Sequence, residues 1–267
     1  MISFGIAGKP ACSKNLEAGM SQLRKMGLDA LEVQFGRGIM LKKDAMRRIA
    51  AAARDNGIRL SCHAPYYINF NSLKPETRER SSDWLRDTCA AAGELGADII
   101  VVHAGRTGDN RADASEAIRS GIGDALERLK DIDWNGHIGI ETMGKASAWG
   151  ELEEIKELCA LSKRLVPVID FAHIHALYGG CYNHAKDYEA TLSSYEELDK
   201  ASLHAHFTCI EYDAKGEKKH LPVSALDPDF HPLAKVLKKR KYPIRIICES
   251  PMLEQDAAIL KQWYERS

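Results

Sequence analysis

The sequence predicts a single (β/α)8 barrel, a TIM barrel, that spans residues 1–267, and three observations support this fold class. Eight short β-rich runs alternate with longer segments of helical period. No Pro/Ser-rich linker or charge block interrupts the alternation. A chain of 267 residues has the usual length of one such barrel, so we expect one domain. A doubly wound open sheet is the alternative, but the first βα turn, Gly5 to Gly8, lacks a GxGxxG fingerprint.

The predicted strands are apolar runs whose spacing leaves room for a helix after each one. This pattern is typical of parallel strands joined by crossover helices rather than of a sandwich. In chain order the strands are Ile2–Gly8, Ala30–Gly36, Arg59–Pro65, Asp98–Gly105, His137–Gly144, Val166–His173, Ser202–Ile210 and Pro243–Ser250.

The segments between these strands repeat apolar residues every three to four positions, with charged residues opposite, as in helices that cover a sheet. Gly27, Gly57, Gly96 and Gly136 each lie shortly before a predicted strand, where glycine suits the end of a helix. The predicted covering helices include Lys42–Asn56, Glu76–Leu95, Ala112–Leu129, Leu152–Leu161 and Glu254–Arg266.

The composition indicates a globular protein without a dominant charge. Hydrophobic residues make up 45% of the chain and charged residues 28%, which is enough for a substantial core. The net charge of -1 provides no overall field towards nucleic acid or a membrane, although a local basic groove remains compatible with it. The seven cysteines form no CxxC pair and no apolar window is long enough for a membrane span, so we expect reduced thiols and a cytoplasmic protein.

Histidines and carboxylates gather where the predicted strands end, which is where the barrel fold places its chemistry. A lone histidine in an apolar strand is usually a hydrogen-bonded core residue. Here, however, such residues from six strands would meet at one opening, where unpaired buried carboxylates would be costly and divalent cations would compensate them. The residues are His63, His103, Glu141, Asp170, His173, His204, His206, Glu249 and, in the loop after the seventh strand, His220.

The expected ligands are imidazole nitrogens and carboxylate oxygens without cysteine, which favours Zn²⁺, Mn²⁺ or Fe²⁺ over a structural thiolate site. His204 and His206 are two positions apart in one strand, so both imidazoles point to the same face. The spacing alone leaves both of them as candidate ligands.

Seven short motifs follow one another along most of the chain. They are HAPYYIN (His63–Asn69), VVHAG (Val101–Gly105), IETMG (Ile140–Gly144), IDFAH (Ile169–His173), HFT from His206, KKH ending at His220, and CESP (Cys248–Pro251). As an ordered set they resemble the endonuclease IV family of apurinic/apyrimidinic endonucleases, within the xylose-isomerase-like TIM barrels.

The resemblance implies base excision repair chemistry: hydrolysis of the DNA phosphodiester 5′ to an abasic site by two or three clustered divalent ions, usually zinc, with Mn²⁺ or Fe²⁺ as alternatives. It implies Glu141 and Glu249 as catalytic residues and prefers His206 over His204 as a ligand. By this resemblance, a first ion would be held by His63, His103 and Glu141, a second by Glu141, Asp170, His206 and Glu249, and a third with the help of His173 and His220.

The resemblance also implies how the substrate, double-stranded DNA with abasic sites, would be bound by a monomeric protein. Tyr66 and Arg37 match a tyrosine and an arginine that the family places near the lesion. Lys218 stands where the family has an aspartate ligand of the third ion, two positions before His220. That ion would then be weakly held, completed by Glu217 or water, or absent with Lys218 contacting phosphate. A metal-dependent sugar isomerase or epimerase of the same superfamily is the alternative function.

Overall fold

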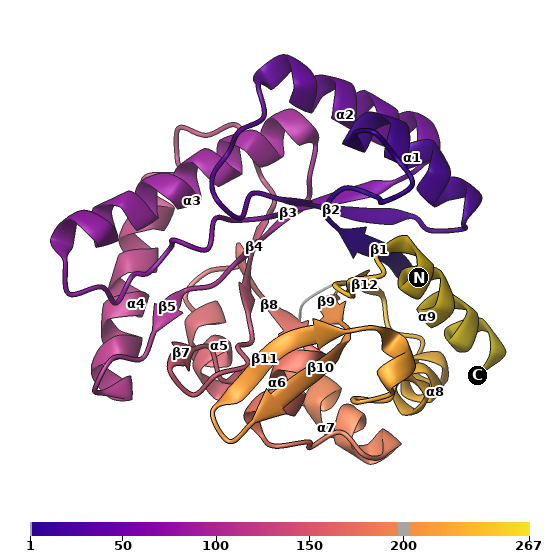
Figure 1. Cartoon of the computed structure of the whole chain (residues 1–267). Helices are drawn as coiled ribbons and strands as arrows, with labels where there is room; N and C mark the ends of the chain where they lie inside the picture. Colours follow the sequence, from indigo (N-terminus) through magenta and orange to yellow (C-terminus); the bar gives the residue numbers. More distant parts are fainter. Residues whose placement is uncertain (1, 197–202) are drawn as a thin grey trace.

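The structure, a computed structural model, describes residues 2–196 and 203–267 and confirms the predicted barrel (Figure 1). Parallel strands close it in the order β1-β2-β3-β4-β6-β8-β9-β12. Ser202, the first residue of the seventh predicted strand, lies outside the described residues. The strands are β1 (Ser3–Ala7), β2 (Ala30–Gln34), β3 (Arg59–His63), β4 (Ile99–Val102), β6 (His137–Glu141), β8 (Leu165–Asp170), β9 (Leu203–Phe207) and β12 (Ile244–Cys248).

Helices lie outside the strands and cover the barrel (Figure 1). Gly57 and Gly96 end α2 and α3 in the left-handed conformation, with φ of 62° and 68°, as predicted. Gly136 does not cap a helix, because α4 already ends at Glu127. The helices are α1 (Leu16–Lys25), α2 (Lys43–Asn56), α3 (Pro75–Leu95), α4 (Arg111–Glu127), α5 (Leu152–Cys159), α6 (Phe171–Leu177), α7 (Ala185–Glu196), α8 (Phe230–Arg240), α9 (Glu254–Arg266) and the 3-10 helix η1 (Val223–Ala225).

Buried apolar residues fill the space between the strands and the helices, and alternate strand residues point into the barrel. On β4 and β8 the inward residues are Ile99, Val101, Val166 and Val168, which form their own buried cluster. Continuing the same alternation by two residues leads to His103 and Asp170 at the carboxyl ends of the strands. The period of the strands therefore turns an apolar interior into a polar opening at one end.

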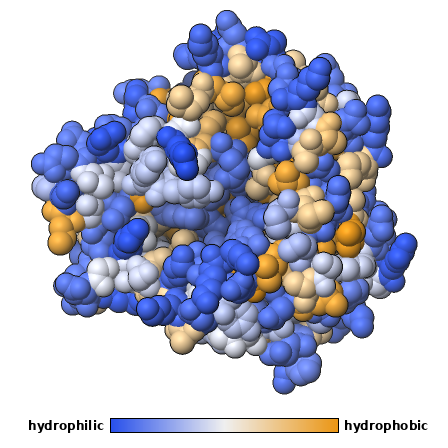
Figure 2. Space-filling view, viewed as in Figure 1, coloured by the Kyte–Doolittle hydropathy of each residue, from blue (hydrophilic) through white to orange (hydrophobic). Residues whose placement is uncertain are grey.

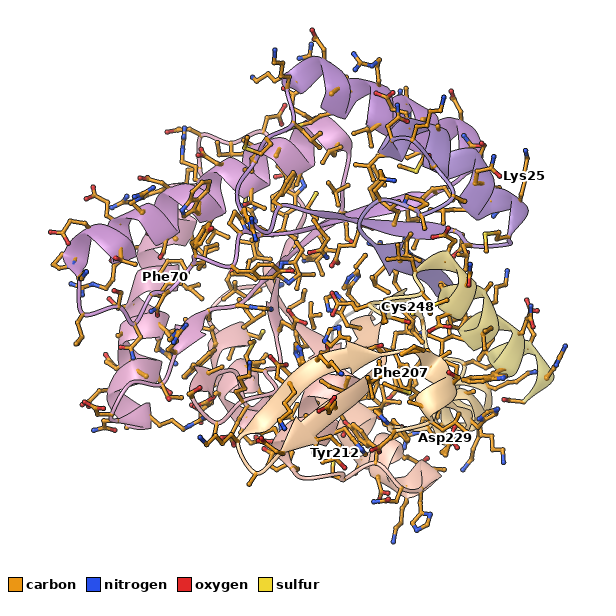
Figure 3. The ribbon with its side chains drawn as sticks, in the orientation of Figure 1. Lys25, Phe70, Phe207, Tyr212, Asp229 and Cys248 are labelled. Atoms are coloured by element: carbon orange, nitrogen blue, oxygen red, sulfur yellow. The ribbon has the colours of Figure 1, made fainter. Side chains whose placement is uncertain are left out.

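Two small antiparallel sheets extend this end of the barrel. β5 (Gly105–Arg106) pairs with β7 (Ala148–Trp149), and β10 (Cys209–Asp213) pairs with β11 (Gly216–Leu221). The seventh strand is thus shorter than predicted: β9 ends at Phe207, and the chain continues into β10. Phe207 pairs with Cys248 of β12 (Figure 3). His220, expected in a loop, lies on β11.

The sixth predicted strand also ends earlier than expected, because Asp170 begins a helix. Its carboxylate accepts a hydrogen bond from the backbone N–H of His173 at 2.8 Å and caps α6. Aspartate is a favoured residue at this position, since its side chain pairs with one of the free N–H groups of the first turn. His173 therefore lies in the first turn of α6, and its imidazole returns towards the end of β8.

Candidate metal centre

The polar end of the barrel holds a cavity of about 1040 Å³. Figure 2 shows a hollow lined by hydrophilic residues near the middle of this face. Most of the predicted site residues lie on its wall, although they come from strands far apart in the sequence. The wall includes His63, Tyr66, His103, Glu141, His173, Glu217, His220 and Glu249.

Glu141, at the end of β6, is the side chain around which three imidazoles meet. Its Oε2 atom lies 2.7 Å from Nε2 of His103 and 3.2 Å from Nε2 of His63, while its Oε1 atom lies 2.8 Å from Nδ1 of His206. Glu141 is only 1% exposed, so water does not screen these contacts. His63, His103 and Glu141 each offer a ligand atom within 4.8 Å of the others, which is the predicted first set.

A second group of potential ligands shares Glu141 with the first. Glu141, Asp170, His206 and Glu249 offer ligand atoms that lie within 4.8 Å of one another. Oδ2 of Asp170 is fully buried and has no hydrogen-bond partner among the described residues. A buried carboxylate oxygen without a partner is costly, and a divalent cation would satisfy it. The donor set therefore fits a metal ion.

A third group contains Asp170, His173 and His220. Nε2 of His173 lies 2.8 Å from Oε2 of Glu217, which is on β11 and on the cavity wall. Lys218, unlike Glu217, is not among the cavity-lining residues of the described chain. Its Nζ atom pairs with Asp213 at 3.3 Å. A phosphate contact by Lys218 would require its ammonium group to leave Asp213. Glu217 therefore has the better position to complete this group.

Backbone carbonyls fix the orientation of three of these imidazoles. Nδ1 of His63 lies 2.8 Å from the carbonyl oxygen of Ala64, and Nδ1 of His173 lies 2.9 Å from that of Thr142. His220 uses Nδ1 in the same way, 3.2 Å from the carbonyl oxygen of Glu249. When Nδ1 carries the hydrogen and donates it to a carbonyl, the lone pair is on Nε2. Each ring is thus oriented to offer Nε2 as a ligand.

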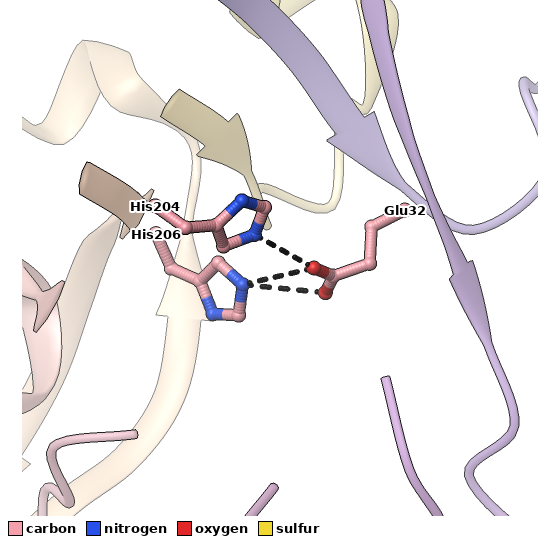
Figure 4. Close-up of side chains that lie close together, drawn as sticks. All are labelled: Glu32, His204 and His206. Atoms are coloured by element: carbon pink, nitrogen blue, oxygen red, sulfur yellow. Dashed lines mark hydrogen bonds and ion pairs between the residues drawn. The ribbon is translucent and has the colours of Figure 1, made fainter. Parts of the chain in front are cut away.

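His206 is held differently, by a residue that the sequence did not indicate. Its Nε2 atom lies 3.2 Å from Oε1 of Glu32, and Nε2 of His204 lies 2.9 Å from Oε2 of the same carboxylate (Figure 4). Burial lowers the pKa of His204 to about 4, although the nearby Glu32 opposes this shift. His204 is thus neutral and contacts Glu32, while His206 reaches the carboxylates at the cavity. This geometry favours His206 as the ligand.

Positive imidazoles balance the buried carboxylates. Burial by itself would raise the pKa of Glu141, but the charges of His206 and His103 and their hydrogen bonds lower it well below its usual value. Burial alone would lower the pKa of His206, but the carboxylates of Glu249, Glu32 and Glu141 raise it well above its usual value. Burial raises the pKa of Glu249; His206 opposes this rise and Glu141 adds to it. Bound divalent ions would take over this balancing role.

Tyr66 and Arg37 lie at the mouth and beside it, respectively. The ring of Tyr66 is 5.2 Å from that of His63, its hydroxyl donates to Gln34 at 3.2 Å, and the residue is 56% exposed. Arg37 is exposed and lines an adjoining cavity of about 510 Å³ whose wall shares two residues with the central one. The adjoining cavity is lined by Arg37, Tyr67, Thr77, Arg80 and Trp84.

Residues 20–266 match the family described as xylose isomerase-like TIM barrel. The chain belongs to this family. Within the family it is 32% identical over 268 residues to an uncharacterized protein of Methanocaldococcus jannaschii, covering 99% of this chain and 97% of that protein. It is 34% identical over 153 residues to the probable endonuclease 4 of Oceanobacillus iheyensis, covering 54% of this chain and 48% of that protein.

A second probable endonuclease 4, from Bacillus subtilis, is 29% identical over 185 residues, which cover 66% of this chain and 55% of that protein. The chain thus spans about half the length of these two endonuclease relatives. Two solved structures share the family's fold. One is endonuclease IV from Thermus thermophilus, with a TM-score of 0.76, 20% identity and coverage of 99% of this chain and 100% of that one. The other is a D-tagatose 3-epimerase-like protein, with a TM-score of 0.75, 22% identity and coverage of 99% and 97%.

Replacement of Glu217 by glutamine is expected to remove one bound ion per chain, because a neutral amide is a weaker ligand beside His173. Elemental analysis of the purified variant measures this count. Glu211→Gln is the matched control, since Glu211 lies on the same hairpin and pairs with Lys219 at 3.0 Å. If both variants bind as many ions as the wild type, Glu217 does not complete the third group.

Proposed function

We propose that this protein is a metal-dependent endonuclease that hydrolyses the DNA phosphodiester 5′ to abasic sites. The observation that carries this proposal is the set of three adjoining ligand groups at one cavity, two of which share Glu141. Ions held next to each other can stabilise both the attacking and the leaving oxygen of a phosphodiester. We further propose that two or three ions, with zinc as the proposed metal, are held by His63, His103, Glu141, Asp170, His173, His206, His220 and Glu249.

The residues of this chain would act together in that reaction. Divalent ions bound at this centre would make a water molecule nucleophilic at neutral pH and offset the charge that develops on the phosphoryl group. Glu249 would orient the attacking water, because its carboxyl group lies beside His206, at 3.6 Å, and faces the cavity.

Tyr66 and Arg37 would bind the damaged strand next to the cleavage site. An exposed aromatic ring at the mouth can stack on a nucleotide that flanks the missing base, and unstacking is least costly at such a damaged step. Arg37 and Arg80 both line one adjoining cavity, where two guanidinium groups would suit a phosphate of the same strand. The proposed partner is therefore double-stranded DNA with abasic sites.

Two kinds of comparison support the proposal in part. The probable endonuclease 4 relatives match half or more of this chain, and the endonuclease IV structure has the same fold. The epimerase-like structure has almost the same TM-score, however, and a sugar isomerase or epimerase needs a lysine or carboxylate base; Lys145 lies on the cavity wall, 3.3 Å from Glu217. A metal-dependent sugar isomerase or epimerase is thus the second candidate.

A duplex oligonucleotide with one abasic site tests the proposal. With Zn²⁺ or Mn²⁺ present, we expect one nick 5′ to the site and a 3′-hydroxyl end that a DNA polymerase extends, while the undamaged duplex stays intact. Ketose and aldose interconversion is measured in parallel. Sugar turnover without nicking would contradict the endonuclease proposal and support an isomerase or epimerase. Bound metal without either activity would indicate a non-catalytic barrel.

The described helices include none that is both long enough and apolar enough to cross a membrane. A cytoplasmic location and a monomeric state stay predictions from the sequence.

A further inference from the structure

Glu32 is a carboxylate inside the barrel that the proposed reaction does not use. It lies on β2, and its two histidine partners lie on β9 (Figure 4). These strands are not neighbours, because β1 and β12 separate them in the barrel. The contacts between Glu32 and His204 and His206 therefore cross the interior, below the cavity wall.

Within the described residues, the polar partners of the Glu32 carboxylate are all hydrogen-bond donors. Oε2 receives Nε2 of His204 at 2.9 Å and the hydroxyl of Ser61 at 3.0 Å. Oε1 receives the amide of Gln34 at 3.1 Å and lies 3.2 Å from Nε2 of His206. The residue is 0% exposed. A carboxylate with two donors on each oxygen is held in one position and has little capacity left for another partner.

His206 connects this buried carboxylate to the metal centre through its two ring nitrogens. Nε2 faces Glu32, whereas Nδ1 lies 2.8 Å from Glu141 and 3.6 Å from Glu249. An imidazole that binds a metal through one nitrogen commonly donates the hydrogen of the other to a carboxylate or carbonyl, which sets its tautomer and raises its basicity.

We propose that Glu32 is a positioning residue that holds His206 with the hydrogen on Nε2, so that Nδ1 is the nitrogen offered to the metal. His204 and Ser61 keep the Glu32 carboxylate in place. His63, His173 and His220 are oriented by neutral carbonyls, whereas the outer partner of His206 is a charged carboxylate. This inference rests on the metal centre of the proposed function but not on its substrate.

Glu32, His204 and His206 also have ligand atoms within 4.8 Å of one another, which raises the alternative of an ion held by these three residues. Two features oppose it. Nε2 of His206 would have to give up its hydrogen, and none of the three residues is among those that line the cavity of the described chain, so an ion there would lack the cavity as a route from solvent. The two measurements below distinguish a positioning role of Glu32 from a metal site formed by these three residues.

The first test uses the full-length protein with Glu32→Gln, which keeps the size of the side chain and removes its charge. Metal-free protein is titrated with Zn²⁺ against a chelating dye. We expect the number of ions per chain to stay the same and the affinity of one of them to fall about 10- to 100-fold. Glu211→Gln, a change at a partly exposed position on the β10–β11 hairpin, is the control and should match the wild type.

The second measurement needs no variant. In zinc-loaded protein with ¹⁵N-labelled histidine, long-range ¹H–¹⁵N spectra should show the hydrogen of His206 on Nε2 and a metal-bound Nδ1. The opposite assignment would overturn the proposal, as would an unchanged zinc affinity in folded Glu32→Gln protein. Loss of one whole ion with the others unaffected would show instead that Glu32 is itself a ligand. Neither measurement uses DNA, so a failure to nick abasic sites would contradict only the proposed function and not the role of Glu32.

Discussion

Replacement of Glu141 by glutamine is expected to lower the rate of abasic-site cleavage by more than about 10³-fold, since a single well-placed donor can already be worth about 10²–10³. Glu141 contacts His63, His103 and His206 and belongs to two ligand groups. A neutral amide there cannot bridge two cations. The initial rate of nicking on a labelled duplex, at saturating metal, measures the effect.

The fold of the Glu141→Gln protein should remain, because glutamine has the same shape and the carboxylates of Glu249 and Glu32 still balance His206. Circular dichroism and gel filtration check this point. Glu127→Gln serves as the control: the side chain of Glu127 on α4 is 70% exposed and pairs with Lys130, so its rate should equal that of the wild type. His63→Ala should lose activity in the same way as Glu141→Gln. A rate near normal in either of these two variants would contradict the proposed centre.

Removal of the bound ions is expected to lower the melting temperature by roughly 10 °C. Binding to the folded state alone contributes about 4 kcal/mol at a metal concentration 1,000 times Kd, and each kcal/mol shifts the melting temperature of a domain this large by about 2–4 °C. The structural reason is that Glu141, Asp170 and Glu249 lie together, with Asp170 fully buried.

Differential scanning calorimetry before and after chelation measures this shift, and elemental analysis confirms that the ions are gone. Adding Zn²⁺ back should restore the original melting temperature. If the metal-free protein melts at the same temperature as the loaded one, the carboxylates do not depend on cations, and the centre has to be explained by imidazole charges alone.

The strands and most of the site were predictable because they depend on local pattern. His63 and Glu141 end β3 and β6 as expected, since an apolar run followed by a polar residue indicates both the strand and its end. His173 and His220 were expected near the site but in other local structures. The capping bond from Asp170 starts α6 early, and the β10–β11 pairing makes a strand of the segment that holds His220.

Glu32 could not be recognised in the same way. A glutamate between Leu31 and Val33 in an apolar strand has no local signal of function, and its partner His204 lies 172 residues further along the chain. Only closure of the barrel brings the two side chains together. The pairing of Lys218 with Asp213, which leaves Glu217 facing His173, depends likewise on how the hairpin folds.

The sequence by itself determined the alternation of strands and helices, the inward period of each strand and the residue types at the strand ends, because these follow from interactions between near neighbours in the chain. Tertiary structure decided which nitrogen of each histidine faces the centre, which of His204 and His206 reaches the carboxylates, and which carboxylate stands behind His206. These features depend on side-chain contacts across the interior, which form only once the first and last strands of the barrel pair.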